Sequence, residues 1–216
     1  MSNYRILIAG GGTGGHLFPA LAIGEEIHRR EPEAKIHYVG STFGMEARVF
    51  PVKDVWHTLL PIRGFQRGIS FQSIGRNFLL PVRIIRSWLK MNSLIKDFVP
   101  QVVVGTGGYA AALPLYLASK RDKPLPIILQ EQNSIPGITT RWFAEKAKTI
   151  CVAFKEANDA INSETILTGN PVRKDITEGH REDGIKEYNF DEKSKTLFLF
   201  GGSQGSAYLN KMMDQV

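Results

Sequence analysis

The sequence predicts an α/β fold with a mainly parallel sheet, and three observations support this prediction. Short apolar runs of strand length alternate along the chain with longer segments of helical periodicity. The apolar runs show little polar alternation, which is typical of strands in a sheet covered on both faces. Several runs end directly in glycine-rich loops followed by helical segments. A length of 216 residues with 43% hydrophobic content is enough for a buried core.

The expected elements follow one another in chain order. Strands are expected at residues 4–9, 35–39, 55–62, 101–104, 126–129, 149–153, 165–167 and 196–200. Helices are expected at about residues 15–30, 78–99, 108–119 and 137–146, and another is expected to begin near Ala207. A strand, a helix and a further strand form the repeating unit of a parallel sheet.

The pattern also predicts a division into domains. A turn at Gly169–Arg173 precedes a polar, charged stretch, after which the strand, glycine loop and helix from Thr196 repeat the opening unit of the chain. We therefore expect a first domain at 1–168, a linker region at 169–195 and the start of a second domain at 196–216. About 20 residues are too few to bury a core of their own, so the chain is expected to be part of a longer protein.

The net charge of +6 is concentrated in one stretch. Residues 61–96 contain seven Lys or Arg and no Asp or Glu. The second half of this stretch is expected to form an amphipathic helix, with Arg83, Arg86 and Lys90 on one face and Val82, Ile85, Trp88 (or Leu89), Ile95 and Phe98 on another. Such a segment indicates an anionic partner, and we favour a membrane surface over nucleic acid, for which no recognised motif is present. A helix packed on the sheet with a solvated charged face is the alternative interpretation.

Three expected strand ends open into glycine-rich loops, at Gly10–Gly15, Gly105–Gly108 and Gly201–Gly205. In a parallel sheet these loops share the carboxyl edge, where ligands bind. Glycine lets the backbone approach a phosphate closely, and the following helix N-terminus offers unpaired N–H groups and partial positive charge. Tight turns use glycine for their own geometry as well, but three such loops together predict a phosphorylated ligand.

The first loop also fits the dinucleotide pattern, as Gly10-x-Gly12-x-x-Gly15. A nicotinamide-cofactor site needs an acid at the end of the second strand to bind the ribose hydroxyls. Residues 38–42 contain no acid, which argues against an oxidoreductase. His16 follows the loop at an expected helix start, where the imidazolium form is disfavoured, so it is either a proton acceptor or a histidine that caps and packs.

Five motifs make the chain resemble a known family. They are Gly11-Gly12-Thr13-Gly14-Gly15-His16-Leu17-Phe18-Pro19-Ala20-Leu21-Ala22, Gly107-Gly108-Tyr109, Glu131-Gln132-Asn133, Gly169-Asn170-Pro171-Val172-Arg173 and Gly201-Gly202-Ser203-Gln204-Gly205. No single motif is specific, but their order and spread resemble the MurG family. This is the family of UDP-N-acetylglucosamine–N-acetylmuramyl-(pentapeptide) pyrophosphoryl-undecaprenol N-acetylglucosamine transferases.

The resemblance implies a GT-B fold, in which an N-terminal Rossmann-like domain binds the lipid acceptor and a second Rossmann-like domain holds most of the UDP-sugar. The implied activity is inverting transfer of N-acetylglucosamine from UDP-N-acetylglucosamine to the 4-hydroxyl of undecaprenyl-pyrophosphoryl-N-acetylmuramyl-pentapeptide. This is the last cytoplasmic step in the synthesis of the peptidoglycan precursor lipid II, and therefore part of cell wall biogenesis and division. The implied location is peripheral, on the cytoplasmic face of the bacterial inner membrane. No cofactor and no metal are implied.

The family's binding residues carry over motif by motif. The resemblance implies that the donor contacts Thr13, Gly14, Gly15, Asn133, Arg173 and Ser203. It implies that the acceptor pyrophosphate faces Gly14, Gly15, Gly107, Gly108 and Tyr109. The membrane face is expected to include Arg83, Arg86, Lys90 and Trp88.

One departure from the family's pattern affects the catalytic assignment. The family often has His where this chain has Gln130, and Gln does not act as a general base. We therefore assign the role of general base to His16. Two alternatives from other classes stay open on the sequence alone: a non-catalytic module that binds anionic lipid, and a nicotinamide-dependent oxidoreductase.

Overall fold

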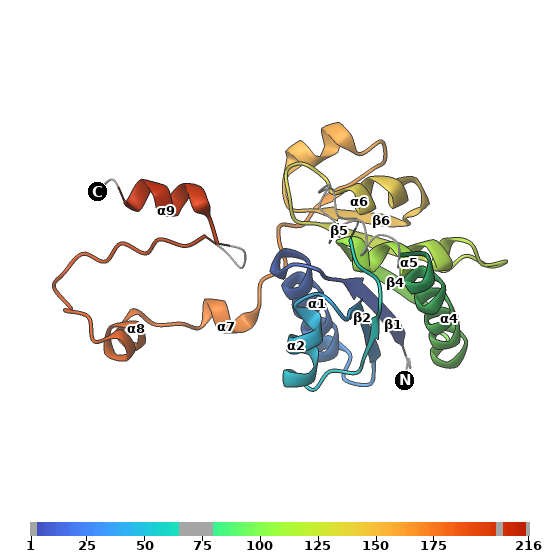
Figure 1. Ribbon diagram of the computed structural model, residues 1–216, viewed down its shortest axis with the longest axis horizontal. Helices are drawn as coiled ribbons and strands as arrows, with labels where there is room; N and C mark the ends of the chain where they lie inside the picture. Colours follow the sequence, from blue (N-terminus) through green and yellow to red (C-terminus); the bar gives the residue numbers. More distant parts are fainter. Residues whose placement is uncertain (1–3, 65–79, 202–204, 215–216) are drawn as a thin grey trace. The chain divides into compact units, whose positions relative to one another are not determined.

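The computed structural model describes residues 4–64, 80–201 and 205–214 (Figure 1). The chain divides into two compact units, Met1–Val172 and Arg173–Val216. Three predictions fall wholly or partly outside the described residues. They are the part of the basic stretch at 65–79, the glycine loop at 201–205 and the donor contact at Ser203.

The first unit is built on a parallel sheet of seven strands in the order β3-β2-β1-β4-β5-β6-β7. The strands are β1 (Arg5–Gly10), β2 (Lys35–Ser41), β3 (His57–Leu60), β4 (Val102–Gly107), β5 (Ile127–Glu131), β6 (Thr149–Val152) and β7 (Ile166–Leu167). All six neighbouring pairs are parallel. The predicted α/β class is confirmed, and β4 and β5 each extend two or more residues beyond their expected ends.

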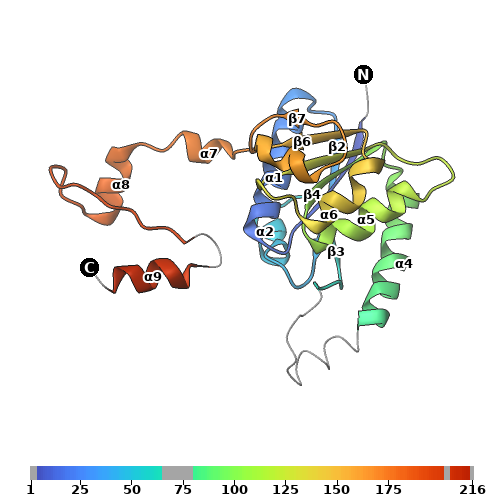
Figure 2. The ribbon, with the colours of Figure 1, turned by 90° about the horizontal axis from the view of Figure 1, so that it is seen from above.

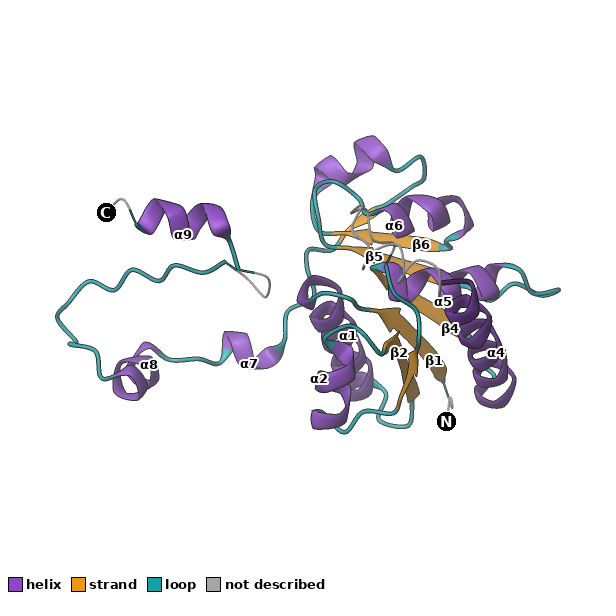
Figure 3. Ribbon diagram, in the orientation of Figure 1, coloured by secondary structure: helices purple, strands orange, loops and turns teal. Residues whose placement is uncertain are grey.

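Helices cover both faces of this sheet (Figures 2 and 3). Helices α1 (Gly14–Arg30) and α2 (Glu46–Val52) lie on one face, and α4 (Leu80–Phe98), α5 (Tyr109–Ser119) and α6 (Ile138–Phe143) lie on the other. Two short 3₁₀ helices, Ala144–Lys146 and Lys155–Ala160, complete the unit.

Alternate residues of β1 supply two separate cores. Ile6 and Ile8 pack with α1 and with Phe50 of α2, whereas Leu7 and Ala9 pack with the helices of the opposite face. This two-sided burial explains why the central strands read as continuous apolar runs.

The prediction of which face of α4 is buried is wrong for the first half of the helix. The helix buries Ser87, Met91, Ile95 and Phe98, whereas the predicted apolar residues of its first half are exposed, namely Val82, Ile85, Trp88 and Leu89. The two sets form different stripes, because at about 100° per residue a spacing of 4, 4 and 3 selects one side of the helix. The second half of α4 therefore packs on the sheet, and its first half presents an apolar surface. Among the described residues, no helix is long and apolar enough to cross a membrane.

The second unit contains α7 (Lys174–Thr177), α8 (Arg181–Tyr188) and α9 (Ala207–Met213). The helix expected near Ala207 is confirmed. The strand expected at 196–200 is wrong, because the structure assigns no strand there, and Leu197 and Phe198 are both more than 80% exposed. A strand requires a hydrogen-bonded neighbour, and the described part of this unit supplies none.

Candidate active site at the switch point of the sheet

The two glycine loops of the first unit meet where the strand order reverses. Strands β1 and β4 are neighbours, yet the helices that follow them, α1 and α5, cover opposite faces. A crevice at the carboxyl ends of such a strand pair is the usual ligand position in open α/β sheets. The contact is close, because a Cβ at Gly108 would collide with the carbonyl oxygen of Gly11. Both loops therefore form one continuous surface.

Four glycines of these loops have a positive φ, and two of them show why no other residue fits. Gly12 has a φ of 92° and Gly108 a φ of 75°, which side-chain-bearing residues rarely adopt. A Cβ at Gly12 would lie 2.6 Å from the ring of Tyr109, the first residue of α5. The predicted acceptor contact Tyr109 thus packs on the predicted donor loop. Burial raises the pKa of the Tyr109 phenol, so it remains a hydrogen-bond donor at neutral pH.

A buried carboxylate that the sequence reasoning missed supports the first loop. Glu46, the first residue of α2, is fully buried, and its oxygens accept hydrogen bonds from the backbone N–H of Gly12 (3.0 and 3.1 Å) and of Ser41 (2.7 Å). Glu46 is the first acid after the second strand, five residues beyond Ser41. Because its oxygens are engaged with backbone amides, Glu46 is not available to a ribose, and this argues further against a dinucleotide site.

The orientation of His16 follows from its hydrogen bonds. Its Nδ1 lies 2.9 Å from the carbonyl oxygen of Thr106 and 2.9 Å from Oε1 of Gln132. A backbone carbonyl only accepts hydrogen bonds, so Nδ1 carries the proton. In the neutral imidazole the lone pair then resides on Nε2. His16 is half-buried, and the Thr106 hydroxyl donates to its backbone carbonyl at 2.8 Å.

A series of hydrogen-bonded side-chain amides supports the Nδ1 side of the His16 ring. Gln132 donates from Nε2 to the carbonyl of Thr106 (2.8 Å) and to the side chain of Gln130, and Gln130 donates to Asn170 at 3.4 Å. Asn170 in turn donates to the carbonyl of Gln132 at 3.3 Å. Gln130 is only 3% exposed, so it supports the histidine through Gln132 and does not face solvent.

The loop that follows β5 is held in place by a second buried carboxylate, that of Glu131. Glu131 accepts from the backbone and side-chain N–H groups of Asn133 (3.0 and 2.8 Å), from the N–H of Gly137 (3.0 Å) and from the hydroxyl of Thr140 (2.6 Å). Because four donors engage its two oxygens, the carboxylate of Glu131 stabilises the loop and has a structural role. Asn133 itself is exposed at the same edge of the sheet, where the sequence places a donor contact.

The structure brings together most, but not all, of the predicted site residues. Thr13 precedes α1, and Gly14 and Gly15 begin it, beside Gly107, Gly108 and Tyr109. Arg173 is the first residue of the second unit, whereas these six residues belong to the first unit. Among the described residues, no group of three or more His, Cys, Asp or Glu is arranged to hold a metal ion.

The expected membrane-face residues lie along α4. Arg83 stands over the ring of Phe43 at 5.0 Å, and Lys90 donates to the carbonyl of Leu59 at 2.9 Å, so both lean towards the β3 side of the helix. Trp88 lies near Tyr116 of α5, with ring centroids 5.9 Å apart. Arg86 is exposed. Arg83 and Lys90 of α4 therefore contact the segments around β3, whereas Trp88 contacts α5.

The strand order and the glycine loops at its switch point define a Rossmann-like α/β domain. Residues 6–152 match the model of the glycosyltransferase family 28 N-terminal domain, and the chain belongs to this family.

The chain is similar to longer proteins that share one name, UDP-N-acetylglucosamine–N-acetylmuramyl-(pentapeptide) pyrophosphoryl-undecaprenol N-acetylglucosamine transferase. It is 37% identical to the protein of that name from Christiangramia forsetii, over 97% of this chain and 57% of that protein. It is 35% identical to the one from Bacillus subtilis, over 96% of this chain and 56% of that protein. The chain thus spans little more than half the length of these relatives.

The fold is also found in a solved structure. The crystal structure of Acinetobacter baumannii MurG superimposes with a TM-score of 0.61 at 23% identity, over 81% of this chain and 47% of that chain. At this level of identity the likeness concerns the fold.

Proposed function

We propose that the whole protein carrying this chain is an inverting N-acetylglucosaminyltransferase. Its donor is UDP-N-acetylglucosamine, and its acceptor is the 4-hydroxyl of undecaprenyl-pyrophosphoryl-N-acetylmuramyl-pentapeptide. The product is lipid II, so the protein acts in peptidoglycan synthesis. The names of the relatives and the five motifs support this proposal.

The observation that carries the mechanism is the pair of contacts at Nδ1 of His16, with the carbonyl oxygen of Thr106 and Oε1 of Gln132, from which we assign the proton to Nδ1. In the proposed reaction the acceptor oxygen attacks the anomeric carbon on the face opposite UDP. The carbon–oxygen bond to UDP breaks, and UDP leaves with the bonding electron pair. The unprotonated Nε2 of His16 accepts the hydroxyl proton. Its Nδ1–H is held by Thr106 and Gln132, so the ring neither rotates nor changes tautomer without losing both contacts.

The remaining site assignments are part of the same proposal. Thr13, Gly14, Gly15 and Asn133 of the first unit, with Arg173 and Ser203, bind the donor. Gly14, Gly15, Gly107, Gly108 and Tyr109 face the acceptor pyrophosphate. The backbone N–H of Gly12 already donates to Glu46, so the phosphate is bound by the backbone N–H groups at the start of α1. Residues 1–168 form the acceptor domain, and 196–216 begin the donor domain after a linker.

A transfer assay on the whole protein tests this assignment. We expect His16→Ala to lower kcat by about 100- to 10,000-fold with little change in the KM for UDP-N-acetylglucosamine, because a general base acts only in the chemical step. His28→Ala is the matched control, since His28 is exposed on the same helix. An unchanged kcat in His16→Ala would remove this residue from the base role.

We further propose that α4 attaches the protein to the cytoplasmic face of the inner membrane. Val82, Ile85 and Leu89 are 50%, 60% and 64% exposed, and Arg83 and Arg86 flank them. Apolar side chains inserted at the interface strengthen the attraction of basic residues to anionic lipid. Replacing Ile85 and Leu89 with Ser should lower the affinity for phosphatidylglycerol vesicles, measured by co-sedimentation, by about 10-fold or more. Val52→Ser, at an exposed apolar position of α2, should leave it unchanged.

A further inference from the structure

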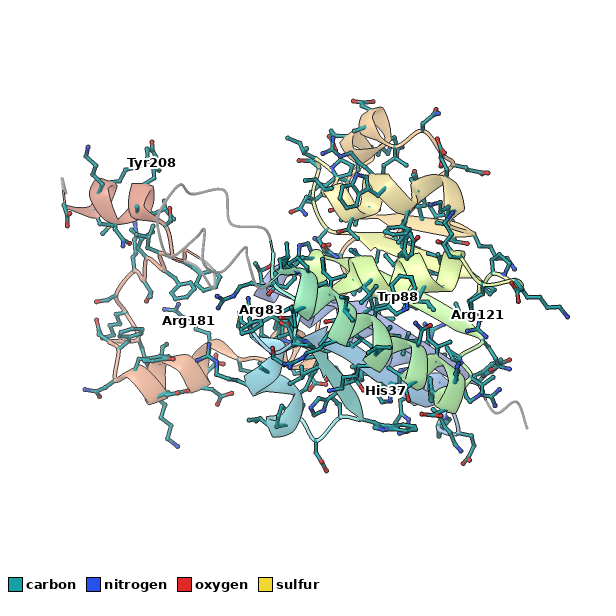
Figure 4. All side chains as sticks on the ribbon, turned by 45° about the vertical axis from the view of Figure 1, so that its right-hand side comes forward. His37, Arg83, Trp88, Arg121, Arg181 and Tyr208 are labelled. Carbon is teal, nitrogen blue, oxygen red and sulfur yellow. The ribbon has the colours of Figure 1, made fainter. Side chains whose placement is uncertain are left out.

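Two arginines approach the ring of one phenylalanine at the carboxyl edge of the sheet. The guanidinium carbon of Arg63 lies 4.5 Å from the ring centroid of Phe43, and that of Arg83 lies 5.0 Å from the same centroid. Phe43 is the second residue after β2, Arg63 is the third after β3, and Arg83 lies in the first turn of α4. Figure 4 shows Arg83 near the beginning of α4, well apart from Trp88 and Arg121. Three separate segments therefore bring two cations to one ring.

The charges of this cluster are not balanced. No ion pair joins either arginine to an acid among the residues that the structure describes. Both arginines are half-buried, and Phe43 is 41% exposed. The face of a ring attracts each cation, but it does not remove the repulsion between two guanidinium groups. An anion between them removes this repulsion, and a guanidinium binds a carboxylate through two parallel hydrogen bonds. The cluster therefore has the composition of a carboxylate site.

The loop that carries Arg63 packs against the predicted acceptor contact Tyr109. A Cβ at Gly64 would lie 3.1 Å from the Tyr109 ring, and a Cβ at Gly12 would lie 2.6 Å from the same ring. Burial raises the pKa of the Tyr109 phenol, and the charge of Arg63 is among the influences that oppose this rise. The arginine cluster therefore borders the glycine loops without being part of them.

The strand order places this cluster on one side of the switch point. It follows β2 and β3, whereas the predicted donor contact Asn133 follows β5, on the other side of β1 and β4. Neighbouring strands lie about 4.8 Å apart, so the ends of β2 and β3 are roughly 10 Å from the switch point. The peptide of a muramyl pentapeptide is attached through the oxygen next to the reacting 4-hydroxyl, and five extended residues span up to about 17 Å. A peptide that begins beside His16 is therefore long enough to reach the arginines.

We propose that Arg63, Phe43 and Arg83 form a subsite for the C-terminal carboxylate of the acceptor's peptide. The carboxylate lies between the two guanidinium groups, and the side chain of the terminal residue lies on the ring of Phe43. This proposal rests on the proposed transferase function and adds a determinant of acceptor specificity to it. It also gives Arg83 a partner other than the membrane, to which Arg86 and the exposed apolar residues of α4 remain assigned.

The first test measures transfer by the whole protein to a water-soluble analogue of the acceptor with a short prenyl chain, so that membrane attachment has no influence. The analogue is supplied with a free C-terminal carboxylate or with a C-terminal carboxamide. In the unaltered protein the carboxamide should raise the KM for the acceptor by about 10-fold, with little change in the KM for the donor. In the double variant Arg63→Gln, Arg83→Gln, the KM for the free acid should rise by a similar factor and equal that for the carboxamide.

The matched control is Arg121→Gln with Lys96→Gln, which removes two charges from exposed positions and should retain the preference for the free acid. An unaltered protein without this preference overturns the proposal. It is also overturned if the double variant raises the KM equally for both analogues, because the arginines then contact the pyrophosphate.

The second test does not depend on transfer. Acetyl-pentaalanine, whose only charge is its C-terminal carboxylate, is titrated into this chain in parallel with its C-terminal amide and with inorganic pyrophosphate. In ¹⁵N NMR the Nε–H signals of Arg63 and Arg83 should move in a saturable way with the free acid and not with the amide, while that of Arg121 stays in place. A response to pyrophosphate at lower concentration, or none to the free acid, overturns the subsite. If the whole protein transfers to no acceptor, the transferase proposal fails, and this titration still decides whether the cluster binds a carboxylate.

Discussion

Acidification should destabilise the first unit through one buried histidine. His37 on β2 is 3% exposed, and its Nε2 contacts the hydroxyl of Thr58 at 2.9 Å. Its Nδ1 has no hydrogen-bond partner among the described residues, and its ring lies against Trp56 and Phe98, at 4.8 and 5.5 Å between centroids. Burial, with a smaller contribution from His57, lowers the pKa of His37 to about 4.

The sign and size of the effect follow from proton linkage. The unfolded chain titrates with a pKa of about 6.5, so between pH 6.5 and 4 the unfolded state binds more protons than the folded state. The contribution to stability is present above pH 6.5 and is lost progressively as the pH falls towards 4. A shift of this size corresponds to at most about 3.4 kcal/mol, and to about 2 kcal/mol between pH 7 and pH 5.

Urea unfolding followed by tryptophan fluorescence measures this loss. We expect the free energy of unfolding to fall between pH 7 and pH 5 by about 2 kcal/mol more in the unaltered chain than in His37→Gln, which lacks the titrating group. His28→Gln serves as the control, because His28 is exposed. The reasoning is refuted if the unaltered chain and His37→Gln lose the same stability over this pH range.

Three further predictions concern the loops. Glu46→Gln should lower the free energy of unfolding by about 1.5–3 kcal/mol, because an amide replaces the charged acceptor of the Gly12 and Ser41 N–H groups; exposed Glu25→Gln should not. Gly108→Ala should destabilise by about 2 kcal/mol or more, measured by thermal unfolding, since the new Cβ collides with a backbone carbonyl, while Gly184→Ala in open space on α8 should be neutral or stabilising. Imidazole ¹⁵N NMR of the chain should show neutral His16 protonated on Nδ1, and a spectrum with the proton on Nε2 would contradict the assigned tautomer.

The central strands were predictable because each one has a signal within its own short stretch of sequence. Strands β1, β4 and β5 are buried on both faces, so each is an apolar run followed by a glycine loop or a polar motif. The peripheral elements were harder. Helix α2 is seven residues long and contains Pro51, so it shows little helical periodicity. The stretch at 196–200 has strand composition but no partner in the described residues, and composition alone does not create a ladder.

The candidate site was predictable in its loops and not in their supports. His16 and the glycines stand in contiguous motifs, which a sequence displays directly. Glu46 reaches Gly12 across 34 positions, and Gln132 reaches His16 across 116, so neither contact has a local signature. The glycines at 40 and 44 beside Glu46 were the available signal, since each makes room for its side chain.

The role of position 130 can now be separated from that of His16. Gln130 is almost completely buried and touches Gln132, which alone of the two amides contacts the histidine. An imidazole at this position would take over the partners of a buried amide, with no exposed surface through which to accept a substrate proton. We therefore expect Gln130→His in the whole protein to change kcat by less than about five-fold, against the loss of 100-fold or more expected for His16→Ala. A kcat raised 100-fold by Gln130→His would instead place the missing base at position 130 and reduce His16 to a packing residue.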